Sequence, residues 1–325
     1  MGATNPRIPP QPSGVAIGTD RSRFRLDDPF LRAVGGTPLL PLTRLVEPHG
    51  GTFEVLAKAE FLNPTGSVKD RAALGIVRRA IEEGLLDSGR TLVDASSGNT
   101  AVAYAMLGAR VGFPVELILP RNANPERVAR IRAYGARVVF TDPLEGTDGA
   151  QREAHRLAVE DPTRYFHPDQ YNNSANPDAH YATTGPEIWR QSRARVTHFV
   201  AGVGTGGTIS GTGRFLKEQR SSLEVIGVEP SGPMHGLEGL KHIPTALRPS
   251  TYDEQVVDRT IRVETEDAQL MRRRLAAEEG LMVGMSAAAA VHAAIEVGRD
   301  SPGAVIVTLL PDAGHGVKAE EEEEE

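Results

Sequence analysis

The stretch NPTGSVKDRAALG, Asn63–Gly75, places a lysine directly behind a tight turn, at the start of an expected helix. Asn, Pro and Gly are residues that turns prefer, and Lys69 comes three positions after the glycine. Most lysines at such a place are solvated and have no further role. The rest of the sequence decides between that alternative and a lysine with a chemical function.

Length and composition describe an ordinary globular protein. The chain has 325 residues, enough for two domains or one large α/β unit, with 39% hydrophobic and 24% charged residues. Its formal net charge is −7, and the run Glu320–Glu325 carries most of that negative charge. The remainder is close to neutral, so we expect neither a nucleic-acid nor a membrane partner.

Cysteine is absent, which excludes disulfides, cysteine-based zinc sites and thiol nucleophiles. No apolar run approaches the roughly 20 residues that span a bilayer, and the N-terminal stretch lacks the apolar core of a secretory signal. We therefore expect a soluble, cytoplasmic protein with a loose leader over 1–22 and a disordered acidic tail over 319–325. The nine histidines are scattered, and no metal site is predicted.

Short apolar runs alternate with amphipathic stretches, as in βα units around a mainly parallel sheet. The expected strands are Phe53–Ala57, Thr91–Asp94, Val115–Leu119, Arg137–Phe140, Thr197–Ala201, Glu224–Glu229, Thr260–Val263 and Ala304–Leu310. The expected helices are Val68–Glu83, Thr100–Val111, Pro125–Ala133, Gly149–Glu160, His180–Gln191, Thr208–Glu218, Asp267–Glu279 and Ala287–Val297. Residues 161–181 show no clear periodicity, and we interpret them as the boundary between two α/β halves.

Three glycine-rich turns come where a strand is expected to end and a helix to begin, which is where α/β sheets bind ligands. The first precedes Lys69, the second is ASSGNTAVAYA (Ala95–Ala105), and the third is GVGTGGTISGTG (Gly202–Gly213). The third turn matches the dinucleotide pattern GxGxxG, and the strand after it ends in Glu229. The same turn also suits any phosphate at a helix N-terminus, or a purely structural role.

Hydroxyl and amide side chains crowd the second turn, where Ser96, Ser97, Asn99 and Thr100 bracket a glycine. Such residues ordinarily cap a helix, but four exceed what one helix needs, and its unpaired N–H groups favour a carboxylate. Ser286 in GMSAAAA is expected to cap a helix of small residues. Its surroundings lack the second glycine of a nucleophile elbow, which argues against a serine hydrolase.

Together, NPTGSVKDR, SSGNT, the run Gln170–Trp189, GVGTGGTISG and GMSAAAA resemble the cysteine synthase family. The resemblance runs in order from about Gly35 to Gly314, and TTGPEIW with GTGGT points to cysteine synthases and their cystathionine β-synthase relatives. It implies an α/β protein of pyridoxal-phosphate fold type II, the tryptophan synthase β-like fold, with two three-layer α/β domains. The smaller domain is expected over residues 48–160, and the larger over 23–47 and 161–318.

The resemblance also implies the site residues. Lys69 would be the catalytic residue and would hold pyridoxal 5'-phosphate as a Schiff base, which requires shielding from water and a lowered pKa. Asn99 would bind the 3′-oxygen of the cofactor ring, and Ser286 would face its pyridine nitrogen. The phosphate would be held by Gly204, Thr205, Gly206, Gly207 and Thr208, and the carboxylate of the amino acid by Ser96, Ser97, Asn99, Thr100 and Gln170.

The implied activity is that of a cysteine synthase, which replaces the β-substituent of O-acetylserine or O-phosphoserine with sulfide through an aminoacrylate. The family also implies a homodimer. A serine hydroxyl cannot keep the pyridine nitrogen protonated as a carboxylate could, which favours loss of a β-substituent over transamination. Three alternatives stay open: condensation of serine with homocysteine, as in cystathionine β-synthase; a nicotinamide-dependent dehydrogenase built on Gly202–Gly207; and a scaffold that has lost catalysis.

The sequence departs from the family pattern at several positions. Ser96 and Ala101 stand where threonine and glycine are usual, and Ala287–Ala288 follow Ser286 in place of a glycine. The segment Pro230–Pro244 is shorter than in the common acetylserine-using enzymes and is closer to the M-type cysteine synthases. After residues 311–314 the usual Arg-Tyr is missing, so the pattern does not predict how the site closes at this end.

Basic residues gather in and just after the shortened segment: His235, Lys241, His242 and Arg248. In the expected fold this segment lies near the mouth of the site, where a basic group favours a donor that carries a phosphate. Solvated surface charges are the alternative, and O-acetylserine is the default donor.

Overall fold

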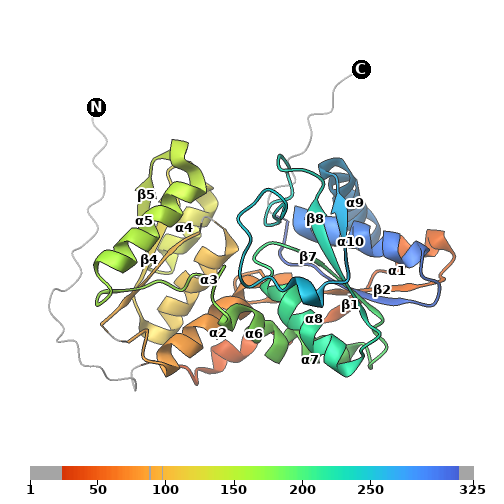
Figure 1. The fold of residues 1–325 in the computed structure, drawn as a ribbon, viewed down its shortest axis with the longest axis horizontal. Coiled ribbons are helices and arrows are strands. Elements are labelled where there is room, and N and C mark those ends of the chain that lie inside the picture. Colours follow the sequence, from red (N-terminus) through yellow and green to blue (C-terminus); the bar gives the residue numbers. More distant parts are fainter. Residues whose placement is uncertain (1–23, 88, 97, 315–325) are drawn as a thin grey trace.

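The computed structural model describes residues 24–87, 89–96 and 98–314. The predicted leader and acidic tail, and Ser97, lie outside these residues. Two β-sheets lie next to each other, each with helices packed on it (Figure 1). The larger sheet has six strands in the order β1-β2-β10-β7-β8-β9, and the smaller has four in the order β5-β4-β3-β6.

The strands of the larger sheet are β1 (Leu39–Pro41), β2 (Glu54–Lys58), β7 (His198–Gly202), β8 (Glu224–Pro230), β9 (Arg259–Val263) and β10 (Val305–Leu309). Those of the smaller sheet are β3 (Thr91–Ala95), β4 (Val115–Pro120), β5 (Arg137–Thr141) and β6 (Tyr165–Phe166). All pairs are parallel except β1 with β2. Every residue of β4 and β10 is buried, as expected of parallel strands covered by helices on both faces.

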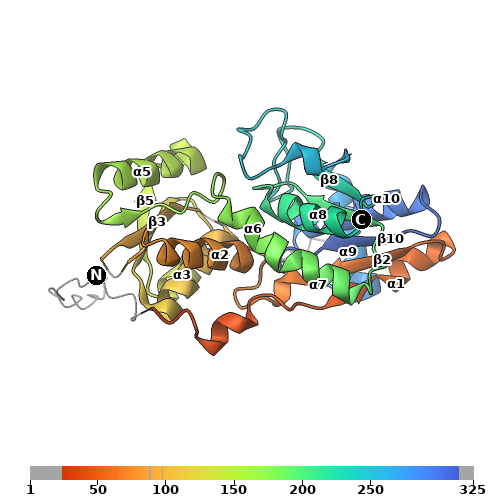
Figure 2. The same ribbon diagram turned by 60° about the horizontal axis from the view of Figure 1, so that its bottom comes forward.

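The α-helices are α1 (Thr43–Val46), α2 (Lys69–Glu82), α3 (Asn99–Leu107), α4 (Pro125–Ala133), α5 (Gly146–Glu160), α6 (Ala175–Ala182), α7 (Thr184–Gln191), α8 (Gly207–Gln219), α9 (Thr265–Glu279) and α10 (Met285–Arg299). Short 3₁₀ turns occur at 29–33, 47–49, 60–62, 143–145 and 254–256, and a π turn at Gly108–Gly112 follows α3. α6 packs against both α2 and α8, and so joins the two halves (Figure 2). None of the helices in the described part of the chain has the length and apolar character to cross a bilayer.

The predicted division into halves differs from the observed strand pairing. β2 was expected in the smaller unit, but it pairs with β10 in the larger sheet, because its apolar side chains enter the cores on both faces of that sheet. β6, from the stretch interpreted as a boundary, pairs with β3 in the smaller sheet.

Two helix predictions also need correction, and most of a third helix was not predicted. The helix expected at 100–111 ends at Leu107, and the rest is the π turn. The one expected at 180–191 is two helices that meet at Thr183. α6 was missed because the residues it buries, Ala175, Asn176 and His180, are small or polar and give no apolar periodicity.

Candidate active site

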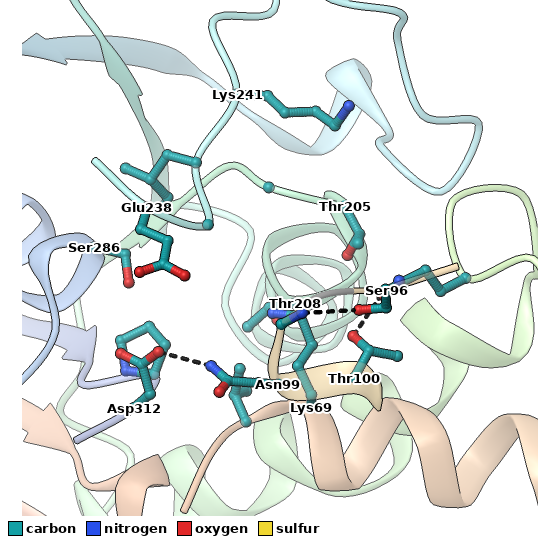
Figure 3. Close-up of a pocket in the computed structure, with 18 of the residues that line it drawn as sticks. Lys69, Ser96, Asn99, Thr100, Thr205, Thr208, Glu238, Lys241, Ser286 and Asp312 are labelled. Atoms are coloured by element: carbon teal, nitrogen blue, oxygen red, sulfur yellow. Dashed lines mark hydrogen bonds between the residues drawn. The ribbon is translucent and has the colours of Figure 1, made fainter. Parts of the chain in front are cut away.

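A cavity of about 350 Å³ is lined by residues from both sheets, within the range of small-molecule sites (Figure 3). The carboxyl ends of β3, β7 and β10 reach it, as do the first residues of α2, α3, α8 and α10. Four helix N-termini at one cavity create a surrounding that favours anions, such as a phosphate and a carboxylate.

Lys69 is the first residue of α2 and lies on the cavity wall, half-buried. The turn before it is fixed because the backbone N–H of Val68 donates to the carbonyl of Pro311, 2.8 Å away. Burial lowers the pKa of Lys69, and the nearby carboxylate of Asp312 acts in the opposite direction. Within the described residues no hydrogen bond of its Nζ is found, so the amine is available to a ligand.

Lys58 is more deeply buried than Lys69, but its ammonium group is already bound to three acceptors of the protein. It forms an ion pair with Glu187 at 2.7 Å, and donates to Gln191 Oε1 at 2.9 Å and to the carbonyl of Thr37. Lys58 therefore has its donors occupied by the protein, and it does not line the cavity.

The third glycine-rich turn connects β7 to α8 and forms one wall of the cavity. Gly204, Thr205, Gly206 and Thr208 line it, and Gly207 packs behind them against Asn176. Gly206 has φ +84°, and a Cβ there would lie 2.4 Å from the Cβ of Tyr252, so no other residue fits. The first N–H groups of α8 have no acceptor within the helix, which is the arrangement that binds a phosphate.

The second glycine-rich turn, before α3, contributes polar side chains to another wall of the cavity. Ser96, Asn99, Thr100 and Gln170 all line the cavity, whereas Ser97 lies outside the described residues. The N-cap of α3 is Gly98, without a side-chain cap, so these side chains are not used for capping. Thr100 Oγ1 donates to Gln170 Oε1 at 2.8 Å, which leaves the Nε2 of Gln170 to donate to a ligand.

Ser286 is not the cap of its helix, and that prediction is wrong. The N-cap of α10 is Gly284, because the helix already begins at Met285. Ser286 is therefore inside the first turn, buried, with its hydroxyl on the cavity wall.

Sequence reasoning missed several residues that line the cavity. Asp312 accepts a hydrogen bond from Asn99 Nδ2 at 2.7 Å. Arg127 on α4 forms an ion pair with Glu238 at 2.5 Å across the cavity mouth. The only signal for Asp312 was its place in the stretch 311–314, and nothing in the sequence pointed to Arg127.

Of the four basic residues near the shortened segment, Lys241 lines the cavity, and its Nζ lies 4.7 Å from the ring centre of Tyr171. The other three do not line it: His242 contacts Thr245, and Arg248 pairs with Glu254.

These residues suit pyridoxal 5'-phosphate. The glycine turn at the start of α8 suits its phosphate, Lys69 its aldehyde, and Asn99 and Ser286 the polar atoms of its ring. A dinucleotide suits the cavity poorly, because Glu229, the acid that its ribose would require, is buried in β8 and does not line the cavity.

Residues 30–312 match the family described as pyridoxal-phosphate dependent enzyme. The chain therefore belongs to the pyridoxal-phosphate-dependent enzymes, and its α/β fold is that of fold type II.

Within that class, the chain is 49% identical to a cysteine synthase of Aquifex aeolicus, over 88% of this chain and 89% of that protein. It is 40% identical to cysteine synthase B of Salmonella typhimurium, over 87% and 92%. The crystal structure of a cysteine synthase from Entamoeba histolytica matches 93% of this chain and 91% of that one, with a TM-score of 0.85 and 33% identity. The chain belongs to the cysteine synthase family, which confirms the predicted fold class, cofactor and type of enzyme.

Proposed function

We propose that the protein makes L-cysteine from an activated L-serine and sulfide, with pyridoxal 5'-phosphate held by Lys69 in the cavity between the two sheets. One observation supports this most strongly. The uncommitted amine of Lys69 lies between a phosphate-binding turn and a turn rich in hydroxyl and amide groups.

The binding roles follow from the donor sets on each wall. The turn at the start of α8 would hold the cofactor phosphate, Asn99 its 3′-oxygen, and Ser286 its pyridine nitrogen. The carboxylate of the substrate would be bound at the N-terminus of α3 by these side chains: Ser96, Ser97, Asn99, Thr100 and Gln170. When bound, the cofactor supplies the electron sink that allows a proton to leave Cα and a substituent to leave Cβ.

Lys69 would move the proton. Burial lowers the pKa of this amine, so a larger share of it is neutral near pH 7 and able to take the proton from Cα. The same amine would return the proton to Cα after sulfide has added at Cβ. Helix N-termini on the cavity wall would stabilise the carboxylate during both transfers.

Purified protein, supplied with pyridoxal 5'-phosphate, tests this proposal directly. O-acetylserine, O-phosphoserine and serine are each offered with sulfide or with homocysteine, and products are identified by mass spectrometry. Cysteine from an activated serine and sulfide is the expected result. Cystathionine from serine and homocysteine would instead support the alternative condensation.

The donor could carry an acetyl or a phosphate leaving group, and Lys241 at the cavity mouth is the residue that would distinguish them. A phosphate there would gain a charge-assisted contact worth about 1.5–3 kcal/mol, or roughly 10- to 150-fold in specificity. We expect Lys241→Ala to lower kcat/KM for O-phosphoserine by that factor, and to change the value for O-acetylserine by less than about twofold.

Lys217→Ala is the matched control, because Lys217 pairs with Asp258 away from the cavity. A parent protein that prefers O-acetylserine, together with no donor-selective loss in Lys241→Ala, would contradict a phosphate-binding role for Lys241.

By analogy with the family, we also propose a cytoplasmic homodimer. Analytical ultracentrifugation of the purified protein that shows only monomer would contradict the dimer.

A further inference from the structure

Asp312 lies on the cavity wall, and the roles proposed so far leave it without a function. It follows β10, and its backbone is held on two sides: it pairs with Ser67, and its carbonyl accepts from the N–H of Gly284 at 3.2 Å. The side chain packs directly on residue 284, where a Cβ would lie 2.1 Å from Asp312 Oδ1. The carboxylate therefore has little freedom to move.

The two carboxylate oxygens of Asp312 are used unequally. Oδ2 accepts from Asn99 Nδ2 at 2.7 Å (Figure 3). Oδ1 is buried and has no hydrogen-bond partner within the described residues. Burial raises the pKa of the Asp312 carboxyl, and the charge of Glu238 acts in the same direction. The hydrogen bond from Asn99 and the charges of Lys69 and Arg127 act in the opposite direction and favour the ionised form.

We propose that Asp312 is a positioning residue that fixes the amide of Asn99 toward the cofactor. This inference rests on the proposed function, since it assigns to Asn99 the contact with the cofactor ring. An asparagine amide has two orientations that exchange its oxygen and nitrogen. An ionised carboxylate only accepts hydrogen bonds, so Asp312 selects the orientation in which Nδ2 faces it.

The contact with Asp312 fixes the groups that Asn99 presents to the cavity. With one N–H committed to Asp312, the second N–H and Oδ1 of the amide are held in fixed directions. A pre-oriented donor binds the ring oxygen without first losing rotational freedom. Without Asp312 the amide would rotate, and part of this advantage would be lost.

Two substitutions separate positioning from charge. Asparagine at 312 can still accept from Asn99 through its own oxygen, but its NH₂ group also permits the reversed amide orientation, so it keeps only part of the positioning; alanine keeps none. We expect Asp312→Ala to weaken the affinity of the cofactor-free protein for pyridoxal 5'-phosphate by about tenfold. We also expect it to shift the visible absorption band of the holoenzyme. Asp312→Asn should stay within about threefold of the parent and keep the band.

A double-mutant cycle provides the decisive readout. If Asp312 acts through Asn99, the Asn99→Ala/Asp312→Ala protein should bind the cofactor no more weakly than Asn99→Ala alone. Asp178→Ala, which removes a surface carboxylate paired with Arg79 and Arg214, is the matched control and should leave affinity and band unchanged.

Additive losses in the cycle, or an unchanged affinity and band in Asp312→Ala, would overturn the inference. Unfolding curves of each variant identify any that fails to fold. If Asp312→Ala does not fold, Asp312→Asn is compared with Asn99→Ala, and an equal loss of cofactor affinity in the two would overturn the inference. The proposed function is judged separately by the parent protein, which fails if it shows neither a cofactor band nor cysteine synthesis.

Discussion

Burial lowers the pKa of both Lys58, which is fully buried, and Lys69, which is half-buried on the cavity wall. They differ in their partners. The ammonium group of Lys58 is surrounded by Glu187, Gln191 and a carbonyl, whereas among the described residues the Nζ of Lys69 has no hydrogen-bond partner and the charge that favours its protonated form is that of Asp312. A charged lysine held by three acceptors has a structural place in the fold, whereas an amine without such partners is available to react with an aldehyde.

Ser286 tests the proposed electronic role of the site. Ser286→Asp is expected to reduce cysteine synthesis strongly, because a carboxylate would keep the pyridine nitrogen protonated. Ser286→Ala removes one neutral hydrogen bond, worth roughly 0.5–1.5 kcal/mol, so its kcat should fall by about tenfold at most. Steady-state kinetics of the two variants gives the comparison. An aspartate variant as active as the parent would mean that Ser286 does not face the ring nitrogen.

Most of the candidate site could be predicted from the sequence because its residues lie in short motifs at strand ends and helix starts. Lys69, Asn99, Thr208 and Ser286 are examples, and the structure brings them to one cavity. Asp312 and Arg127 were missed for a physical reason. Their place at the site depends on contacts between distant segments, such as Val68 with Pro311, that no local pattern specifies.

At the level of elements, the segment Leu237–Lys241 joins the two halves at the cavity mouth. It is anchored to the phosphate-binding turn, since the N–H of Lys241 donates to the carbonyl of Val203 at 2.9 Å. From the same segment Glu238 reaches across to Arg127 on α4. The segment therefore contacts both α4 and the turn that would hold the cofactor.

Removing the charge of Glu238 should affect substrate entry more than stability. Glu238 is largely exposed, so Glu238→Gln should change the free energy of unfolding by less than about 1 kcal/mol. We expect KM for the serine donor to change by a few-fold, with a weaker dependence on salt, because the pair spans the mouth. Kinetics at low and high ionic strength checks this. If Glu238→Gln and Arg127→Gln both leave KM unchanged at either ionic strength, the pair does not control entry.

The fold at this level was largely predictable. Strands such as β4 and β10 are short apolar runs, and α4 begins at the expected Asn124–Pro125 boundary, with Asn124 as its cap. The assignment of β2 to a sheet was not predictable, because an apolar strand pairs equally well in either half until tertiary packing decides. The helix α6 was hidden by its polar buried face.

Across the whole molecule, buried polar groups hold the start of α2 in place. Arg71, two residues after Lys69, pairs with Glu60 at 2.7 Å and with Glu187 at 2.8 Å. His180 connects α7 and α8: its ring contacts Thr184 at 2.9 Å and Thr208 at 3.2 Å. Such partnered groups favour one arrangement of the fold, in which Lys69 and the turn at the start of α8 line the same cavity.

His180 also makes stability depend on pH. Burial, with the charges of Arg71 and Lys69, lowers the pKa of His180 from 6.5 to about 3. Between these values the unfolded chain binds a proton that the folded chain does not, so the free energy of unfolding falls as pH falls. From pH 7 to pH 5 this amounts to about 2 kcal/mol.

Two carboxyl groups modify the same pH curve. The pKa of Asp70 is raised to about 6 by burial, which adds stability as pH falls from 6 toward 3.8. The pKa of Glu187 is lowered to about 2 despite burial, mainly by its hydrogen bonds and ion pair with Arg71, so its contribution is lost only below 4.5.

Comparison with His180→Gln separates the contribution of His180 to the pH dependence of stability, because Asp70 and Glu187 are present in both proteins. Urea unfolding at pH 7 and pH 5 should show the parent losing about 2 kcal/mol more than the variant. Equal losses in both proteins would mean that His180 titrates normally in the folded state.

The central claim is that Lys69 holds the cofactor, and the small number of lysines makes it directly measurable. The chain has five: Lys58, Lys69, Lys217, Lys241 and Lys318. Reduction of the holoenzyme with sodium borohydride fixes the cofactor to its lysine, and peptide mapping by mass spectrometry then locates the pyridoxyl group. We predict bleaching of the visible band and a single modified site, Lys69, with no modification in Lys69→Ala. A pyridoxyl group on Lys58 or Lys241, or no modification of the parent protein, would contradict the account.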